Sequence, residues 1–172
     1  MKCLFALSLA LFAGSASAGL IEGRVIEVKD GATITVLSRE GASLHRVRLA
    51  GIDAPRKGRE HEGTSRASLR RLASGRTVRV ETNAIDAKGL LVGTVLFVKN
   101  PKECATQPCD PYIDPGLTQL GMGLAVIDKA NLSWQSSGAR ERYISAQAHA
   151  KANRLGVWRN PHFQVRADPA LR

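Results

Sequence analysis

Residues with chemically useful side chains concentrate in the segment from Leu44 to Gly63. Arg48 lies near the end of an alternating apolar and basic run, and Asp53 follows it shortly before Pro55. More cations come directly after this proline. Guanidinium and ammonium groups gathered in one place bind phosphate oxygens through charge-assisted hydrogen bonds. The candidate phosphate-binding group therefore consists of Arg48, Arg56, Lys57 and Arg59.

The composition agrees with an anionic partner. The 172 residues include 25 Lys and Arg against 15 Asp and Glu, which gives a formal net charge of +10. This excess is compatible with nucleic acid, an acidic surface or simple solubility. The hydrophobic share of 44% and the charged share of 23% exclude a wholly disordered chain and a multi-span membrane protein.

Residues 1–18 have the pattern of a secretory signal peptide. Lys2 gives a positive start, an apolar run follows, and residues 16–18 (Ala-Ser-Ala) have the small-x-small form of a cleavage site. The run is shorter than the roughly 20 apolar residues that a membrane span needs. We therefore expect an exported protein, periplasmic or secreted, whose mature chain begins at Gly19 and contains no membrane span.

Export also decides how the cysteines are interpreted. Cys104 and Cys109 remain in the mature chain, in a stretch rich in proline. In an oxidising compartment, two cysteines at this spacing are expected to form a disulfide. A zinc site would need further ligands nearby, and this stretch offers no His or second Cys pair. We expect a loop tip held by this disulfide.

Short strands with turn residues between them are predicted in the first part of the mature chain. The segments Gly23–Lys29, Thr33–Leu37 and Leu44–Leu49 form a β-meander. Two more strands are predicted at Thr77–Glu81 and Leu90–Lys99 because β-branched and apolar residues recur there.

The segment Ser65–Ser74 has the pattern of an amphipathic helix. Thr64 or Ser65 is the expected N-cap, and Gly75 ends the helix. The apolar face and the cationic face are expected to lie opposite each other. The inward residues would be Ala67, Leu69 and Leu72, and the outward residues Arg66, Arg70 and Arg71.

Two further helices are predicted towards the C-terminus. Asp114 and Pro115 fit the N-cap and the first position of a helix that continues through Leu124. The third helix is expected over Gly138–Arg154 and ends before Gly156. Tyr143 and Trp158 are expected in the core, and a loose tail is expected over residues 161–172.

Five short strands with one helix after the third and two at the end predict an α+β protein. The natural candidate is the small, closed, five-stranded barrel of the OB-fold type. Residues 19–160 would form this one domain.

Four segments, in this order, resemble the thermonuclease (staphylococcal-nuclease-like) family. They are Val28–Thr33, Val47–Pro55, Gly75–Val80 and Asp86–Gly89. The second, Val-Arg-Leu-Ala-Gly-Ile-Asp-Ala-Pro, is the most specific. The resemblance covers roughly residues 23–158 and implies a five-stranded barrel with three helices. It also implies hydrolysis of phosphodiester bonds in DNA and RNA, usually with Ca²⁺.

Two of the side chains that the family uses for catalysis are retained at the matching positions. The first arginine of the family pattern falls on Arg48, and the carboxylate that binds Ca²⁺ falls on Asp53. The neighbouring carbonyl ligand would come from Ala54. Their roles follow from the substrate, because a phosphodiester under attack by water needs cations that absorb developing charge.

Three other family positions are replaced. A second metal-binding carboxylate is expected where this chain has Ala32, the general-base glutamate where it has Arg56, and a second arginine where it has Leu90. Ala32 removes a ligand and a negative charge, and Arg56 puts a permanent cation beside the metal position. These changes indicate that the standard mechanism does not operate.

Nearby acids are weak candidates for replacing the lost groups. Asp30 could join Asp53 as a metal ligand, and Glu60, His61 or Glu62 could supply a base or ligand. Ordinary roles are the simpler interpretation, because an acid before Gly31 is typical of a turn. Asp86 keeps its family position, and a turn-capping role explains it.

Three functions therefore compete. The first is an exported protein, expected to be monomeric, that binds nucleic acid or another polyanion without efficient cleavage and needs no cofactor. The second is an active metal-dependent endonuclease with a rearranged site and Ca²⁺ as cofactor. The third is an envelope module that binds a protein partner, and a steep salt dependence of DNA binding would separate it from the first.

Overall fold

A computed structural model of the chain describes residues 19–73, 75–87, 89–99, 102 and 111–160. The expected signal peptide, the Cys104–Cys109 disulfide and the expected loose tail lie outside the described residues. Within them, no helix is long and apolar enough to cross a membrane.

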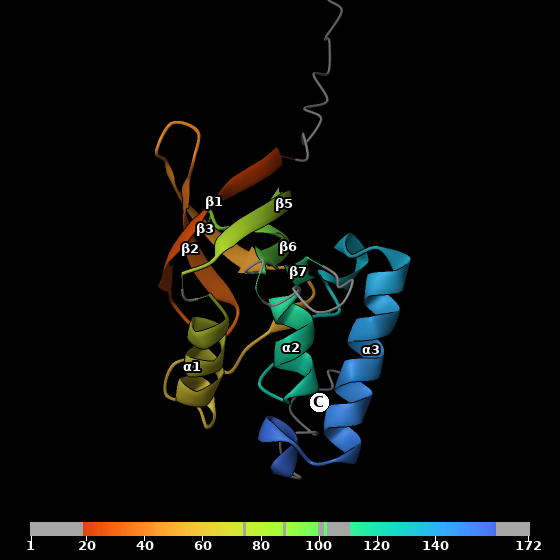
Figure 1. Ribbon diagram of the computed structural model, residues 1–172. Helices are drawn as coiled ribbons and strands as arrows, with labels where there is room; N and C mark the ends of the chain where they lie inside the picture. The colour runs from red at the N-terminus through yellow and green to blue at the C-terminus, as the bar shows by residue number, and fades with distance from the viewer. Residues whose placement is uncertain (1–18, 74, 88, 100–101, 103–110, 161–172) are drawn as a thin grey trace, which may run out of the picture.

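Five strands of the described chain close into a β-barrel (Figure 1). Neighbouring strands pair antiparallel in the order β3-β2-β1-β5-β6, and a parallel pairing of β3 with β6 closes the ring. The short strand β7 (Tyr112–Ile113) extends the sheet beside β6. The barrel strands are β1 (Gly19–Val28), β2 (Thr33–Ser38), β3 (Leu44–Leu49), β5 (Thr77–Ile85) and β6 (Leu91–Val98).

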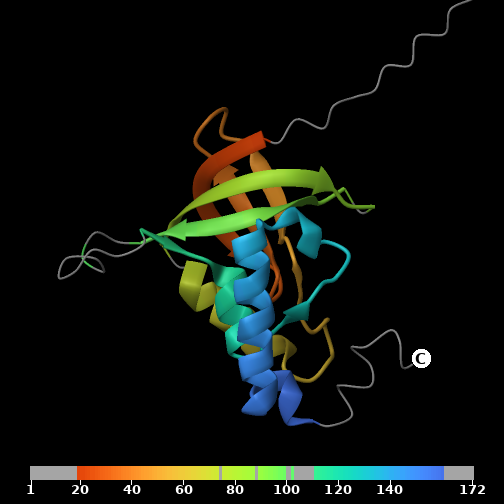
Figure 2. The ribbon, with the colours of Figure 1, turned by 90° about the vertical axis from the view of Figure 1, so that its right-hand side faces the viewer.

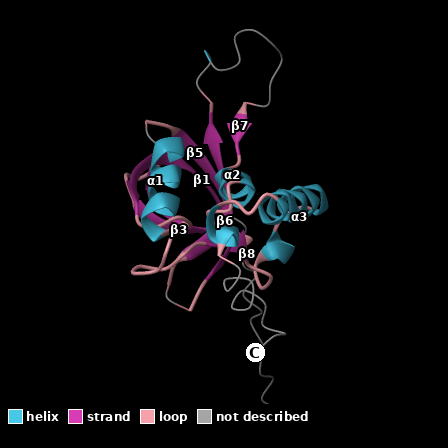
Figure 3. Cartoon of the chain, turned by 90° about the horizontal axis from the view of Figure 1, so that it is seen from below, coloured by secondary structure: helices cyan, strands magenta, loops and turns pink. Residues whose placement is uncertain are grey.

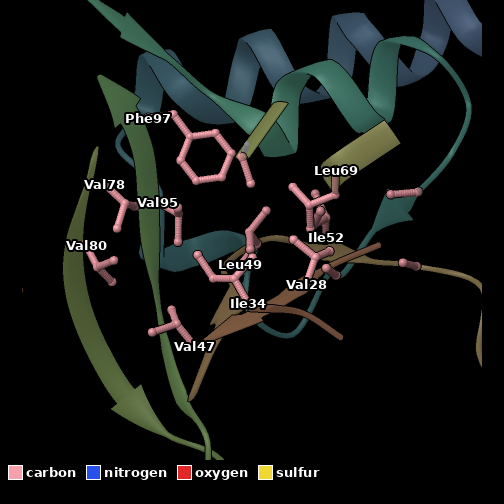
Figure 4. Close-up of a cluster of buried hydrophobic side chains, with 14 of the residues drawn as sticks. Val28, Ile34, Val47, Leu49, Ile52, Leu69, Val78, Val80, Val95 and Phe97 are labelled. Carbon is pink, nitrogen blue, oxygen red and sulfur yellow. The ribbon is translucent and has the colours of Figure 1, made fainter. Parts of the chain in front are cut away.

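The barrel interior is filled by branched aliphatic side chains. Alternate residues of each strand point inward, as the two-residue period of a strand requires (Figure 4). Ile34, Val47 and Phe97 are fully buried, and Leu69 reaches this core from the first helix. The predicted OB-type α+β fold is confirmed.

Three α-helices lie at one end of the barrel in the described residues (Figures 1 and 2). They are α1 (Glu62–Ala73), α2 (Pro115–Gly121) and α3 (Ser137–Ala152). Figure 3 shows α1 and α3 on opposite sides of α2. Two 3₁₀ turns, η2 (Leu132–Trp134) and η3 (Gly156–Arg159), flank α3.

The end of the domain packs back onto α3, as expected. Val157 and Trp158 are buried against Ala150. The Nζ of Lys151 lies 4.6 Å from the centre of the Trp158 ring, which is within the range of a cation–π contact. Tyr143 is also buried, so both predicted core aromatics are confirmed.

The predicted details of the first helix were partly wrong. Helix α1 begins at Glu62, so Thr64 and Ser65 both lie inside the helix and neither is its N-cap. Ala67 is exposed, whereas Ser65 and Ser68 are buried. Polar residues such as serine were expected on the outer face of the helix. Ser65 and Ser68 point inward instead, because their hydroxyl groups form hydrogen bonds with residues outside α1. Ser65 Oγ, for example, donates to the carbonyl of Leu124 at 2.7 Å.

Other boundaries also differ from those predicted. Strand β1 begins at Gly19 rather than Gly23, and β5 continues to Ile85. Helix α2 ends at Gly121, three residues short of Leu124. Two short strands were not predicted, β4 (Ile52–Asp53) and β8 (Val126–Ile127), which pair antiparallel as a separate two-stranded sheet.

The predicted N-cap of α2 is confirmed. Asp114 Oδ1 accepts a hydrogen bond from the backbone nitrogen of Leu117 at 2.9 Å and another from the Tyr143 hydroxyl at 2.9 Å. Burial raises the pKa of Asp114 above 3.8, and its hydrogen bonds only partly oppose this shift. Burial and the neighbouring carboxylate raise the pKa of Tyr143.

Asp114→Asn is expected to change how the stability depends on pH. A raised pKa in the folded protein means that protonation favours folding, so the contribution of Asp114 is largest at low pH and is lost as the pH rises through the folded pKa. Asparagine caps a helix equally well and does not titrate. The free energy of unfolding of the wild type relative to Asp114→Asn should therefore fall as the pH rises from below 3.8 through the folded pKa of Asp114.

Urea unfolding of both proteins across this pH range measures the difference. A constant difference in the free energy of unfolding, or one that grows with pH, would contradict a buried carboxylate with a raised pKa at the N-cap of α2.

Candidate functional site

A cavity of about 490 Å³ opens between α1, the turn from β1 to β2, strand β4 and the turn from β5 to β6. Its walls bring together segments that are far apart in the sequence. The charged residues that line it are the cations Lys29, Arg48, Arg56, Lys57, Arg66 and Arg70 and the acids Glu27, Asp30, Asp53, Glu62 and Asp86. Most of the predicted site residues therefore share one cavity.

Arg48 occupies the centre of an ion-pair cluster at the cavity. Its Nη2 lies 3.2 Å from Asp53 Oδ1 and 3.5 Å from Asp128 Oδ2. Both of these contacts come from the same terminal nitrogen, and no other hydrogen bond joins Arg48 to a side chain of the described residues. The Asp53 carboxylate is 43% exposed and that of Asp128 is 16% exposed. Asp53 is thus already paired with a cation of its own chain.

Asp128 is a member of this cluster that the sequence did not indicate. It follows β8, 80 residues after Arg48, and reaches the site because β8 pairs with β4. In the sequence it has the features of a turn residue only, since its Oδ1 accepts from the backbone nitrogen of Ala130 at 3.1 Å.

The three replaced family positions all line the cavity. Ala32, Arg56 and Leu90 lie on its wall together with Arg48 and Asp53. These three residues cannot supply the metal-binding carboxylate, the general base and the second arginine that the family pattern has at their positions. Relative to the family pattern, the replacements make the wall two charges more positive.

The turn from β1 to β2 forms one wall of the cavity. Asp30 Oδ1 accepts from the backbone nitrogen of Ala32 at 2.8 Å, which is the turn role that the sequence favoured. Lys29 donates its backbone N–H to the carbonyl of Thr33 at 2.9 Å. One carboxylate oxygen of Asp30 is therefore hydrogen-bonded within the turn, while the residue also lines the cavity.

A buried glutamine fixes this turn against α1. Gln119 Nε2 donates to the carbonyl of Gly31 at 2.9 Å and to the carbonyl of Ser65 at 3.0 Å. Ser65 Oγ in turn donates to the carbonyl of Leu124. Helices α1 and α2 therefore hold the turn that carries Asp30 and Ala32.

The turn from β5 to β6 is fixed by Asp86, as predicted. Asp86 Oδ1 accepts from the backbone nitrogen of Leu90 at 3.0 Å, and its carbonyl accepts from Gly89 at 2.9 Å. This geometry presents the Leu90 side chain to the cavity, at the position where the family pattern has an arginine.

Several other predicted residues lie elsewhere. Arg59, Glu60 and His61 do not line the cavity, and His61 Nε2 lies 3.4 Å from Glu60 Oε1. Glu62 does line it, but its Oε1 lies 3.8 Å from Arg66 Nε, four residues further along α1. Of the helix cations, Arg66 and Arg70 reach the cavity and Arg71 does not.

The donor set does not fit Ca²⁺. This hard cation takes six to eight oxygen ligands, several of them carboxylates. Here the retained carboxylate, Asp53, is paired with Arg48, a methyl group stands at position 32, and Arg56 adds a permanent cation. No group of three or more His, Cys, Asp or Glu among the described residues has the geometry of a metal site.

Comparison with known proteins supports the resemblance. The family model described as "Staphylococcal nuclease homologue" matches residues 46–160. The chain belongs to this family. The match includes the part of β3 that carries Arg48, the residues from Asp53 to Lys57 and all three helices. The turn from β1 to β2, which carries Asp30 and Ala32, precedes the matched residues.

Three known proteins are similar to this chain in sequence. Protein ParB of Escherichia coli is 29% identical over 163 residues, which is 94% of this chain and 85% of ParB. A micrococcal nuclease of Shigella flexneri is 29% identical over 147 residues, covering 83% of this chain and 76% of that protein. A probable endonuclease LCL3 of Pyricularia oryzae is 34% identical over 123 residues. This match covers 65% of the chain but only 42% of that longer relative.

Proposed function

We propose that this staphylococcal nuclease homologue binds nucleic acid or another polyanion at the cavity and does not cleave it efficiently. The observation that carries the proposal is the position of Arg56. A cation stands on the cavity wall where the family pattern places its general base, beside Arg48 and Asp53. A base must accept a proton, and an arginine side chain stays protonated at any physiological pH.

The cations of the wall would bind phosphate oxygens directly. Arg56 and Lys57 enter the cavity from the loop after Pro55, and Arg66 and Arg70 enter it from α1. Arginine binds phosphate through several N–H donors, so affinity for a polyanion should fall steeply with salt. We include in the proposal that the chain is exported and monomeric, and that Cys104 and Cys109 form a disulfide.

An active metal-dependent endonuclease with a rearranged site is the second candidate. Its support is that Asp30, Asp53 and Glu62 line the same cavity, although each already has a partner in the chain. The names of the nuclease and endonuclease relatives point in the same direction.

One set of incubations tests both candidates. The chain from Gly19 onward is mixed with plasmid and with single-stranded DNA, with Ca²⁺ or EDTA, and read for cleavage and for mobility shift. We expect a shift that weakens with salt and no Ca²⁺-dependent nicking. Arg56→Ala should weaken binding about tenfold, which is the loss of one good phosphate contact.

The matched control is Arg24→Ala, which removes an exposed cation of β1 that does not line the cavity. It should leave the affinity near that of the wild type. Nicking that needs Ca²⁺ and disappears in Asp53→Ala would contradict the proposal and favour the endonuclease. Neither nicking nor a shift would favour the envelope module that binds a protein partner.

A further inference from the structure

Asp128 lies in a position that is fixed by its own surroundings. Its backbone nitrogen donates to the carbonyl of Gly51 at 3.0 Å, and its Oδ2 accepts from Asn131 Nδ2 at 2.6 Å. With the contact from Ala130 to Oδ1, both carboxylate oxygens are engaged by the turn itself. The carboxylate is therefore held in place independently of Arg48.

The same small sheet that carries Asp128 also carries Asp53. Asp53 pairs with Val126 in the register of β4 and β8, so the two carboxylates are placed by one pair of strands. Strand β8 is tied to α3 because the backbone nitrogen of Ile127 donates to Gln147 Oε1 at 2.8 Å. The two acids that contact Arg48 thus form a rigid support.

This support uses one end of the guanidinium group. The Nη2 of Arg48 contacts both carboxylates, which leaves the Nε–H and the other terminal nitrogen without hydrogen bonds to described residues. A free arginine side chain loses considerable rotamer entropy when it binds a ligand. Arg48 is already held by two carboxylates and still has N–H groups available for a ligand, so it avoids part of that entropy loss.

We propose that Asp128 is a positioning residue that orients Arg48 for a phosphate group of the bound polyanion. The inference rests on the proposed function, because it concerns the same cavity. Asp128 lies outside the family motif Val47–Pro55. Its role would be to pre-organise Arg48, which lies inside that motif. Its action on the ligand runs through Arg48 and not through direct contact.

A purely electrostatic view makes the opposite prediction, which allows a sharp test. Asp128→Asn removes a negative charge from a chain of net charge +10, so long-range attraction alone would strengthen polyanion binding. Positioning instead predicts weaker binding in spite of the added positive charge. The sign of the change therefore separates the two explanations.

The experiment measures the affinity of the chain from Gly19 onward for a single-stranded oligonucleotide at several salt concentrations. Asp128→Asn is expected to weaken binding about fivefold to tenfold. It should also reduce the salt dependence by the contribution of about one phosphate contact. In an Arg48→Ala background, Asp128→Asn should have little further effect, because its action runs through Arg48.

Two further variants control for charge and folding. Glu141→Gln removes an exposed acid of α3 and matches the charge change, and it should not weaken binding. Asn131→Ala loosens Asp128 without changing any charge, and it should weaken binding in the same direction but by less. Thermal unfolding of each variant confirms that the fold is retained.

The outcomes separate this inference from the proposed function. A wild-type chain that binds no polyanion overturns both. A wild type that binds, with Asp128→Asn equal to it or tighter, overturns the positioning role and leaves the proposed function standing. An effect of Asp128→Asn that persists in the Arg48→Ala background also overturns the positioning role.

Discussion

A chain that carries Ala32→Asp, Arg56→Glu and Leu90→Arg together is expected to cleave DNA in a Ca²⁺-dependent manner, whereas the wild type is expected not to do so. The three positions line the same cavity as Arg48 and Asp53. The substitutions put back a second metal-binding carboxylate, a general base and a second arginine at the positions where the family pattern has them. Together the substitutions change the formal charge of the cavity wall by −2, which also favours binding of a divalent cation.

The gain should appear only when the three substitutions are combined. A positioned general base contributes roughly 10² to 10⁴ in rate, and one donor to the developing charge roughly 10² to 10³. Neither operates without a bound metal, and the metal needs the new carboxylate at position 32 and the removal of the cation at position 56. We expect each single variant to remain inactive and the triple variant to exceed the wild type by at least about 10².

The matched control is the triple variant Ala32→Asn, Arg56→Gln and Leu90→Arg. It reproduces the shapes of the new side chains without the carboxylates. Position 32 is only 3% exposed, so thermal unfolding must show that both triple variants fold. Plasmid nicking with Ca²⁺ and with EDTA gives the rates. A folded triple variant with no Ca²⁺-dependent nicking would show that these three positions are not sufficient to confer the activity.

The fold could be predicted from the sequence because its signals are local. Alternating apolar residues such as those around Ile34 and Val47 identify strands, and Asp114 with Pro115 identifies a helix start. The cluster of Arg48 and Asp53 was predictable for the same reason, since one short motif contains both.

What the sequence could not indicate depends on contacts between distant segments. Asp128 joins the site through the pairing of two strands of only two residues each, which leave no periodic pattern to detect. Ser65 was interpreted as a cap because a serine near a helix start usually is one. Its true role became visible only when α2 and the loop after it were placed beside α1.

Gly31→Ala is expected to destabilise the protein by about 3 kcal/mol, because the turn from β1 to β2 has no room for a methyl group. A Cβ at this position would overlap Ser65 Oγ and would lie 2.9 Å from the Cβ of Ala54. Ser65 is fully buried and cannot move aside freely, since its Oγ donates to the carbonyl of Leu124 and accepts from Gln119 Nε2. The substitution must shift the turn or break these hydrogen bonds.

Gly63→Ala provides the matched control, because a Cβ at that position of α1 would meet no atom within 4 Å. Alanine there should be neutral or should stabilise the protein by up to about 1 kcal/mol. Urea unfolding of the two variants and the wild type gives the free energies. If Gly31→Ala were as stable as Gly63→Ala, the close packing of the turn against α1 would be wrong.

The double variant Gly31→Ala/Ser65→Gly tests whether the clash is the cause. Ser65→Gly removes the overlapping Ser65 atoms and leaves the 2.9 Å approach to the Cβ of Ala54. It also loses roughly 0.5 kcal/mol of helix propensity and the hydrogen bond to Leu124. If the clash dominates, the double variant should be more stable than the sum of the two single losses predicts. Additive losses would instead mean that Gly31→Ala acts on the turn alone. Because this turn carries Asp30 and Ala32, the coupling would show that helix packing sets the shape of the cavity.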